Sequence, residues 1–177
     1  MLYSLAYLLG LILAPLVAHI RGWQPASLFF ATAFIYVAFG AISFAQAQYT
    51  LNQFRNAEPM THDTYFIVNH GYYMMNLGFG MAIIGAIIWA QTKFGGMRHP
   101  TLTKALFWLF HLAVMGSTTF LFVFAFFIPK PRTYIDYAEY FETYNLIGAW
   151  SAILAQAAVF GLLALLIWST VARALAR

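Results

Sequence analysis

Residues 61–78 read THDTYFIVNHGYYMMNLG and join a group of polar side chains to the start of an apolar membrane segment. An acid, two histidines and an asparagine lie within positions 62–70. Ionisable side chains cost free energy at membrane depth, so those found there usually pair with one another or have a function. This stretch therefore indicates where a membrane helix begins and where a functional site should be sought.

The composition around this stretch is that of an integral membrane protein. The chain has 177 residues, of which 63% are hydrophobic and 8% are charged, whereas soluble domains have about 25% charged residues. A spanning helix takes about 20 apolar residues, so five helices with short connections fill positions 1–177 as a single membrane domain. Cysteine is absent, which excludes disulfides and thiolate metal sites and leaves imidazole, carboxylate and main-chain ligands.

Turn-forming residues divide the apolar sequence into five segments. We expect an all-α bundle of five transmembrane helices with spans near 2–20, 28–52, 65–92, 101–128 and 144–172. The first segment has a long apolar run with no basic residue before it, which favours a retained helix over a cleaved signal peptide. An odd number of spans places the two termini on opposite sides of the membrane.

Charge is distributed unequally between the two ends of these spans. The connections at 53–63 and 129–142 hold all five carboxylates and three basic residues. The opposite ends hold no carboxylate and six basic residues, namely Arg21, Lys93, Arg98, Lys104, Arg173 and Arg177. The positive-inside rule predicts that this basic side is cytoplasmic, with the N-terminus outside, in a multi-pass protein of the inner (cytoplasmic) membrane. The net charge of +4 fits contact with anionic lipid and does not call for a nucleic-acid partner.

His62 and Asp63 are expected at the outer surface, where the third helix begins. Asp63 is suited to capping that helix, and the pair is equally suited to a hard-cation site of carboxylate and imidazole. His70 follows eight positions after His62, which separates them by about 12 Å along a helix. The two histidines are therefore too far apart to share one metal ion.

His70 is expected about 10 Å deeper than the THD residues, within the hydrocarbon. Its imidazole can hydrogen-bond to a neighbouring helix or ligate a haem or metal. His111 is expected near mid-membrane on the following helix, so a haem held by both histidines is a further arrangement. Gly71, Gly78, Gly80 and Gly85 give the third helix a small-residue face, which allows close helix packing or leaves space for a flat macrocycle.

Two motifs in matched order resemble subunit I of the haem-copper oxidases. THDTYFIVNHGYYMMNLG is similar to the helix of that family with H-D-T-Y-Y-x-V-x-H-x-H-Y, and PRTYIDYAEYFETYN (131–145) to its P-R-R-Y-x-D-Y stretch. WAQTKFGG (89–96) and ALFWLF (105–110) resemble the loop and helix start between them. The resemblance covers the whole chain as the final five of the family's twelve helices.

The resemblance implies roles for four residues. His62 and Asp63 would lie beside the haem propionates and bind a Mg or Mn ion. His70 would be the axial ligand of the oxygen-binding haem, and Arg132 would contact a propionate. The copper ligands belong to family helices outside these five, so the resemblance implies no copper ligand in this chain and no oxygen reduction by this chain alone.

Two departures from the family pattern concern the other haem. The second histidine of H-x-H, which ligates the low-spin haem in the family, is Tyr72 here. Tyrosine ligates haem only rarely, so Tyr72 is a poor replacement. Thr133 stands in the place of the second propionate-binding arginine, which removes one charge-assisted contact.

Three functions remain open from the sequence. The chain is expected to be an integral subunit of a respiratory or redox complex, not catalytic alone, with one haem held by His70. Alternatively, it is one half of a split oxidase subunit I that reduces oxygen or nitric oxide once a partner chain completes it. It can also be a cofactor-free structural or transport subunit. Other membrane subunits and lipid are the expected partners.

Overall fold

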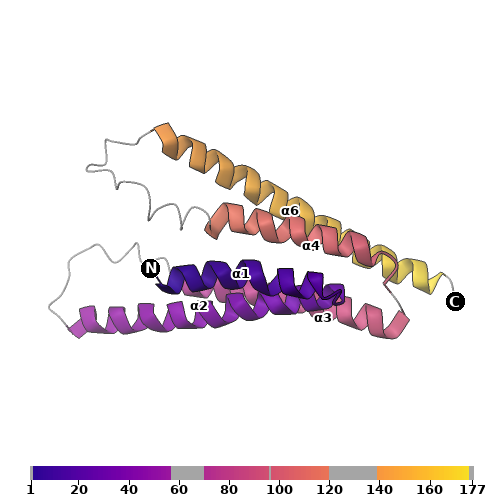
Figure 1. Ribbon diagram of the computed structural model, residues 1–177, viewed down its shortest axis with the longest axis horizontal. Coiled ribbons are helices and arrows are strands. Elements are labelled where there is room, and N and C mark those ends of the chain that lie inside the picture. Colours follow the sequence, from indigo (N-terminus) through magenta and orange to yellow (C-terminus); the bar gives the residue numbers. More distant parts are fainter. Residues whose placement is uncertain (1, 57–69, 96, 120–138, 176–177) are drawn as a thin grey trace. The chain divides into compact units, whose positions relative to one another are not determined.

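The computed structural model describes residues 2–56, 70–95, 97–119 and 139–175, and the regular structure in these ranges is helical (Figure 1). The elements are α1 (Leu2–Ile20), α2 (Pro25–Asn56), α3 (His70–Gly95), α4 (Pro100–Val114) with the π-helical turn η2 (Met115–Thr119), and α6 (Glu139–Ala174). The expectation of an all-helical chain with five helices is confirmed.

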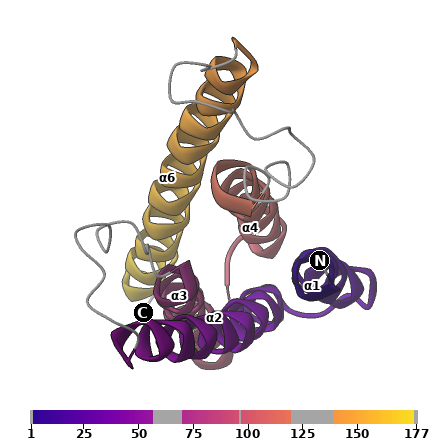
Figure 2. The same cartoon turned by 90° about the vertical axis from the view of Figure 1, so that its left-hand side faces the viewer.

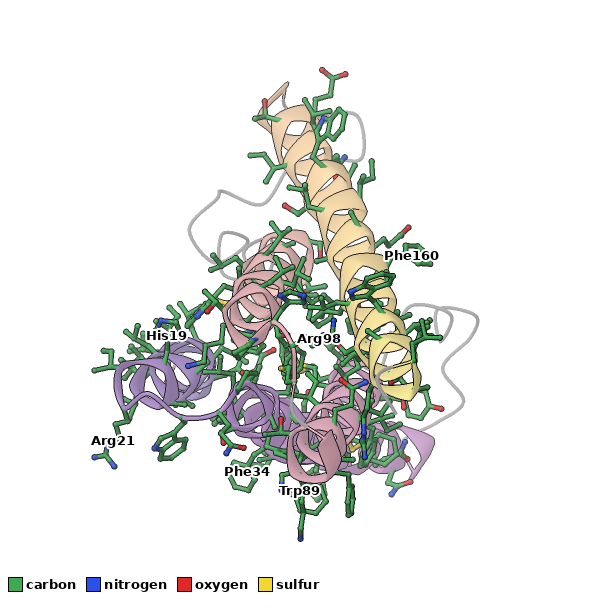
Figure 3. All side chains as sticks on the ribbon, turned by 90° about the vertical axis from the view of Figure 1, so that its right-hand side faces the viewer. His19, Arg21, Phe34, Trp89, Arg98 and Phe160 are labelled. Carbon is green, nitrogen blue, oxygen red and sulfur yellow. The ribbon has the colours of Figure 1, made fainter. Side chains whose placement is uncertain are left out.

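Three of the described helices are long and apolar enough to cross a membrane. These candidate spans are Pro25–Tyr49, Gly71–Phe94 and Asn145–Ala174, and α1 has a shorter apolar stretch, Leu5–Ile20. Large apolar side chains remain exposed on several helices; Phe34, Trp89 and Phe160 are 71%, 46% and 70% exposed (Figure 3). Such an exterior suits contact with lipid or with other membrane subunits.

Several helix boundaries differ from the prediction, and the starts of α2 and α6 show the reasons. α2 begins at Pro25 and not at 28, because proline is tolerated at the first helical position, where its missing N–H has no intrahelical partner. α6 begins at Glu139, five residues before the predicted start, because polar residues extend the helix beyond its apolar window. Positions 65–69 and 120–128 of the predicted spans lie outside the described residues.

The chain divides into two compact units, Met1–Ala90 and Gln91–Arg177, and each is described by itself. In the first unit, α1 ends in a tight turn at Gly22, whose φ of 69° lies in the left-handed region that favours glycine. The N–H groups of Gly22 and Trp23 donate to the carbonyl oxygens of His19 and Ala18, both at 3.0 Å. These are the two hydrogen bonds of a Schellman motif.

After this turn, α2 returns along α1 (Figures 1 and 2). Tyr7 of α1 packs against Tyr36 and Phe39 of α2, with ring centroids 6.2 and 5.3 Å apart. Gly10 lies so close to α2 that an added Cβ would be 3.3 Å from Ile35 Cγ2. Aromatic rings and one glycine therefore form the contact between the first two helices.

α3 packs against α2 through three glycines spaced by seven residues, Gly71, Gly78 and Gly85. A Cβ added to Gly78 would lie 2.7 Å from Val37 Cγ2 and 3.0 Å from the Ala33 carbonyl oxygen. Real Cβ atoms essentially never come within 3.0 Å of another heavy atom, so Gly71 and Gly78 admit glycine alone without rearrangement, whereas Gly85 is only tight, with Phe29 Cβ at 3.0 Å. α2 and α3 are therefore in backbone contact.

The approach is closest at the start of α3. A Cβ on Gly71 would overlap the backbone of Phe44, and one on Gly40 would lie 2.8 Å from the Met75 backbone nitrogen. Glycine thus meets glycine across the interface. The contacts of Gly85 with Phe29 and Phe30 lie further back along α2, so the two helices are antiparallel.

In the second unit, α4 and α6 pack as an antiparallel pair (Figures 1 and 2). Leu106 of α4 contacts Gly161 of α6, and Gly116 contacts Ser151 of α6. From the first contact to the second, the chain advances ten residues from Leu106 and goes back ten residues in α6. This constant register places the start of α4 beside the last turns of α6. The last residues of α3 join the same unit, because Gln91 Nε2 donates to the Leu166 carbonyl oxygen at 2.8 Å.

Candidate functional site

The structure describes part of the predicted site. His70 is the first residue of α3, Tyr72 follows in its first turn, and His111 lies in α4. Three further predicted residues, His62, Asp63 and Arg132, lie outside the described residues. What the structure tests is therefore the setting of the H-x-Y pair on α3 and of His111 on α4.

α3 has a buried side and an exposed side. Met81 and Ile88 are 1% and 0% exposed, and they lie close to one another around the helix axis. The interval from position 70 to Ile88 is eighteen residues, or about five helical turns. Position 70 therefore lies in line with Ile88 around the helix axis.

Tyr72 lies on the other side of α3. Its side chain is 59% exposed, and Phe79 and Ile83 on the same side are 53% and 62% exposed. Two residues along an α-helix are separated by about 200° around its axis. Positions 70 and 72 are therefore on nearly opposite sides of the α3 axis.

The four glycines of α3 do not form one face, which corrects the sequence prediction. Gly71, Gly78 and Gly85 are buried against α2, whereas Gly80 is exposed and would have open space for a Cβ. The error is one of helical geometry, because Gly80 follows Gly78 by two residues and is turned about 200° away from it. Of the two uses left open for this face, close helix packing is the one found at the three buried positions.

His111 has a closed environment within the second unit. Its side chain is 1% exposed, and its ring stacks on Phe107 with centroids 5.5 Å apart and an interplanar angle of 11°. Trp108 covers it edge-on at 6.1 Å. His70 belongs to the first unit, so a haem shared by the two histidines stays a prediction.

The donor chemistry on α3 fits a haem at one of its two candidate positions. Imidazole is the usual axial ligand of haem iron, and His70 supplies one at the first position of α3. The Tyr72 phenol is exposed and of a type that seldom ligates haem. Within the described ranges, no three His, Asp or Glu side chains gather to hold a metal ion, and the cation site at His62 and Asp63 stays a prediction.

Gln91 is not among the residues predicted from the sequence, and its side chain connects two helices in the second unit. Its side-chain amide donates to the Leu166 carbonyl oxygen at 2.8 Å and to Thr170 Oγ1 at 2.9 Å. A lone amide near the end of an apolar segment is a signal for such a contact, because polar side chains in membranes hydrogen-bond across helices.

Comparison with known proteins identifies the family. Residues 4–168 match the family described as cytochrome c and quinol oxidase polypeptide I. Cytochrome c oxidase subunit 1 of Cereibacter sphaeroides is 33% identical over 105 residues, which are 54% of this chain and 17% of that protein. The same subunit of Bacillus subtilis (strain 168) is 34% identical over 119 residues, which are 65% of this chain and 19% of that protein.

A third relative, cytochrome c oxidase subunit 1 of Albinaria turrita, is 32% identical over 110 residues, 62% of this chain and 55% of that protein. The match thus spans between 17% and 55% of the length of these three relatives. No solved structure matches the chain. With the family match running through all five helices, this multi-pass membrane protein belongs to the cytochrome c and quinol oxidase polypeptide I family.

Proposed function

We propose that the chain is an integral membrane subunit of a respiratory or other redox complex that holds one haem through His70 and does not reduce oxygen by itself. In this proposal it corresponds to the C-terminal half of haem-copper oxidase subunit I, as a single membrane domain over 1–177. The family binds haem and copper and works within multisubunit membrane complexes. The observation that carries the proposal is the family match over residues 4–168, within which the chain has a histidine at position 70 and a tyrosine at position 72.

A haem at His70 would supply one-electron redox chemistry or bind a small diatomic ligand. The neutral imidazole of His70 would provide the iron ligand. The backbone contact of Gly71 with α2 fixes the first turn of α3 and so limits the movement of the ligand position. Arg132 would pair with a propionate, and His62 and Asp63 would hold a Mg or Mn ion nearby.

Tyr72 supports the non-catalytic part of the proposal. In the resemblance this position ligates the low-spin haem through which electrons arrive. Here an exposed phenol occupies it, and phenol ligates haem seldom and only as phenolate. We infer that the electron-entry haem is lost and that the chain depends on another subunit for any redox turnover.

The exposed side of α3 supports association with further membrane subunits. Tyr72, Phe79 and Ile83 are more than half exposed, and Gly80 between them leaves open space. A helix face with large apolar side chains around a glycine suits contact with another helix. The unequal charges support an orientation with the N-terminus outside and the C-terminus in the cytoplasm.

The test is the visible absorption spectrum of the protein, purified in mild detergent with the subunits that accompany it. His70→Ala is expected to abolish the reduced-minus-oxidised Soret band, because it removes the iron ligand. Tyr72→Phe and His111→Ala are the matched controls, and both are expected to retain the band because neither ligates iron in this proposal.

Other outcomes distinguish the alternatives. An unchanged spectrum in His70→Ala contradicts the haem role and favours a cofactor-free structural or transport subunit. Loss of the band in both His70→Ala and His111→Ala means that the two histidines share the haem. A co-purified chain with the missing helices and a histidine triad, together with oxygen or nitric oxide consumption, identifies a split oxidase.

A further inference from the structure

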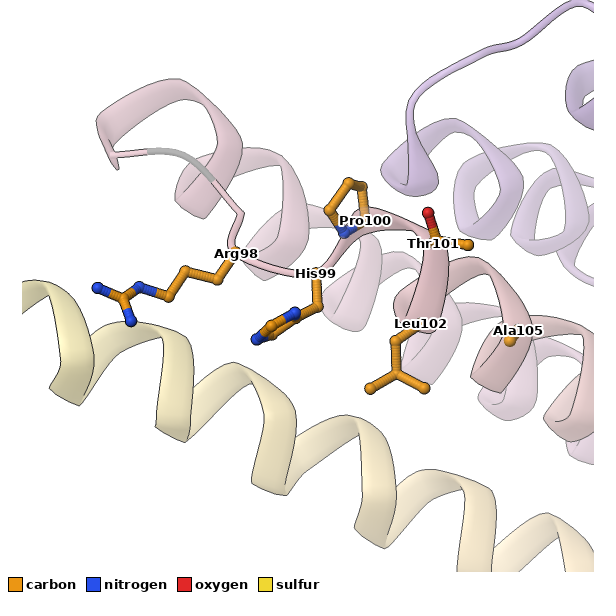
Figure 4. A pocket seen from close by; sticks show the side chains of 6 residues that line it. All are labelled: Arg98, His99, Pro100, Thr101, Leu102 and Ala105. Atoms are coloured by element: carbon orange, nitrogen blue, oxygen red, sulfur yellow. The ribbon is translucent and has the colours of Figure 1, made fainter.

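The start of α4 forms a small basic hollow at one end of the second unit. The hollow has a volume of about 450 Å³ and is lined by Arg98, His99, Pro100, Thr101, Leu102 and Ala105 (Figure 4). In Figure 4 the side chains of Arg98 and His99 extend along the side on which α6 runs. The hollow is separate from the haem position proposed on α3.

Among the described residues, the basic side chains in this part of the unit have no carboxylate beside them. Arg98 lines the hollow, Lys104 lies one turn into α4, and Arg173 is in the last turn of α6. The carboxylates among the described residues of this unit are Glu139 and Glu142, at the other end of α6. Thirty-one residues separate Glu142 from Arg173, which is about 47 Å along a helix.

The first turn of α4 adds donors to this charge. His99 is the N-cap residue, makes no side-chain capping hydrogen bond, and no acidic residue occurs in the first turn. The N–H groups of the first turn of a helix have no intrahelical acceptor, and Thr101 and Leu102 supply two of them here. An anion beside Arg98 would therefore meet a guanidinium and backbone N–H donors together.

The other wall of the hollow is apolar, and this decides the kind of anion. Leu102 is 49% exposed, and Ala105 is exposed one turn below it. The α4–α6 register places His99 beside Trp168, which is 59% exposed, and tryptophan is enriched at the membrane–water interface. A ligand with a phosphate next to an acyl chain matches this arrangement, whereas free phosphate leaves the apolar wall unused.

We propose that this hollow binds the phosphate of an anionic phospholipid, with Arg98 as its principal contact and the lipid's acyl chain along Leu102 and Ala105. The experiment uses the full chain, purified with its membrane partners and stripped of lipid, and measures the first bound lipid by native mass spectrometry. The probes are dioleoyl phosphatidylglycerol and, as the zwitterionic reference, dioleoyl phosphatidylcholine.

Arg98→Gln is expected to weaken phosphatidylglycerol binding about five-fold, as the loss of one basic residue at an anionic surface predicts. Lys104→Gln is the matched control, because it removes the same charge one turn away without lining the hollow; it is expected to weaken binding less than about two-fold. Arg98→Lys keeps a phosphate-binding charge and is expected to stay within about two-fold of the unchanged chain.

Four outcomes would overturn the proposal. Equal losses in Arg98→Gln and Lys104→Gln mean that only the overall surface charge attracts lipid. Equal binding of phosphatidylcholine means that the headgroup charge is not recognised. Full displacement by an equal concentration of inorganic phosphate identifies a free-anion site. A five-fold loss in Arg98→Lys means that folding, and not charge, is disturbed.

Discussion

The two units of this chain use different means to pack their helices. In the first, α2 and α3 approach until backbone touches backbone, at the glycines Gly71 and Gly78. In the second, side chains form the contacts, with Leu106 against Gly161, Ser151 against Gly116, and Gln91 hydrogen-bonded to α6. Lipid is as apolar as leucine, so membrane helices associate through close packing and hydrogen bonds. Contacts between backbones leave no room for adjustment, whereas contacts through side chains can adjust by a change of rotamer.

The largest effect is expected from a methyl group at the closest backbone contact. Gly71→Ala forces α2 and α3 apart and should destabilise the protein by about 3 kcal/mol, the upper range for overpacking. The measurement is loss of helical circular dichroism on heating in detergent. Gly80→Ala is the control, because Gly80 has open space, and alanine there should be neutral or stabilise by up to about 1 kcal/mol through helix propensity.

Equal melting temperatures for these two variants would show that the backbone contact does not limit stability. The pair also bears on the haem proposal, because Gly71→Ala displaces the first turn of α3. The Soret band of the haem proposed at His70 should then broaden or shift in Gly71→Ala and stay unchanged in Gly80→Ala.

A smaller effect is expected in the second unit from Gly116→Ala. The new methyl group would lie 2.6 Å from Ser151 Oγ, but a serine hydroxyl can rotate away, so the cost should be about 1 kcal/mol. Ser151→Ala should relieve part of that cost in the double variant, as measured by a double-mutant cycle. A cost equal to that of Gly71→Ala would mean that both interfaces are equally rigid.

The smallest effect is expected from removal of hydrogen bonds between helices. Thr170→Val removes the hydroxyl that accepts from Gln91 at 2.9 Å and should cost about 0.6 kcal/mol, the average for such bonds in membranes. Gln91→Leu removes this bond and the one to Leu166 and should cost about twice as much. A loss above about 3 kcal/mol in Thr170→Val would make polar contacts, and not glycine packing, the stronger means.

Much of the helical layout could be predicted from the sequence, because long apolar segments separated by turn residues leave few other arrangements in lipid. The start of α2 lies three residues before the predicted span, because Pro25 is turn-forming but also begins helices. The prediction that Gly80 shares a face with Gly78 was wrong, and helical spacing alone places the two glycines on opposite sides of α3.

The site could be predicted only in part. Motif spacing indicated His70 and Tyr72 as a pair, and helix geometry separates their two positions by about 200° around the axis. The burial of His111 under Phe107 and the hydrogen bonds of Gln91 depend on which helices meet. Such contacts join residues up to 75 positions apart, and no local pattern specifies them.

The length of α6 has an electrical consequence. Its 36 residues extend about 54 Å, beyond the roughly 30 Å of hydrocarbon, so both ends reach water or the headgroups. Acidic residues begin the helix and Arg173 ends it. This order of charges is favourable, because it complements the positive N-terminal and negative C-terminal ends of the helix macrodipole. In the proposed orientation, with the basic end in the cytoplasm, the membrane potential would favour α6 by about 2.3 kcal/mol per charge and 100 mV. α6 would then be held in its direction by the energised membrane itself.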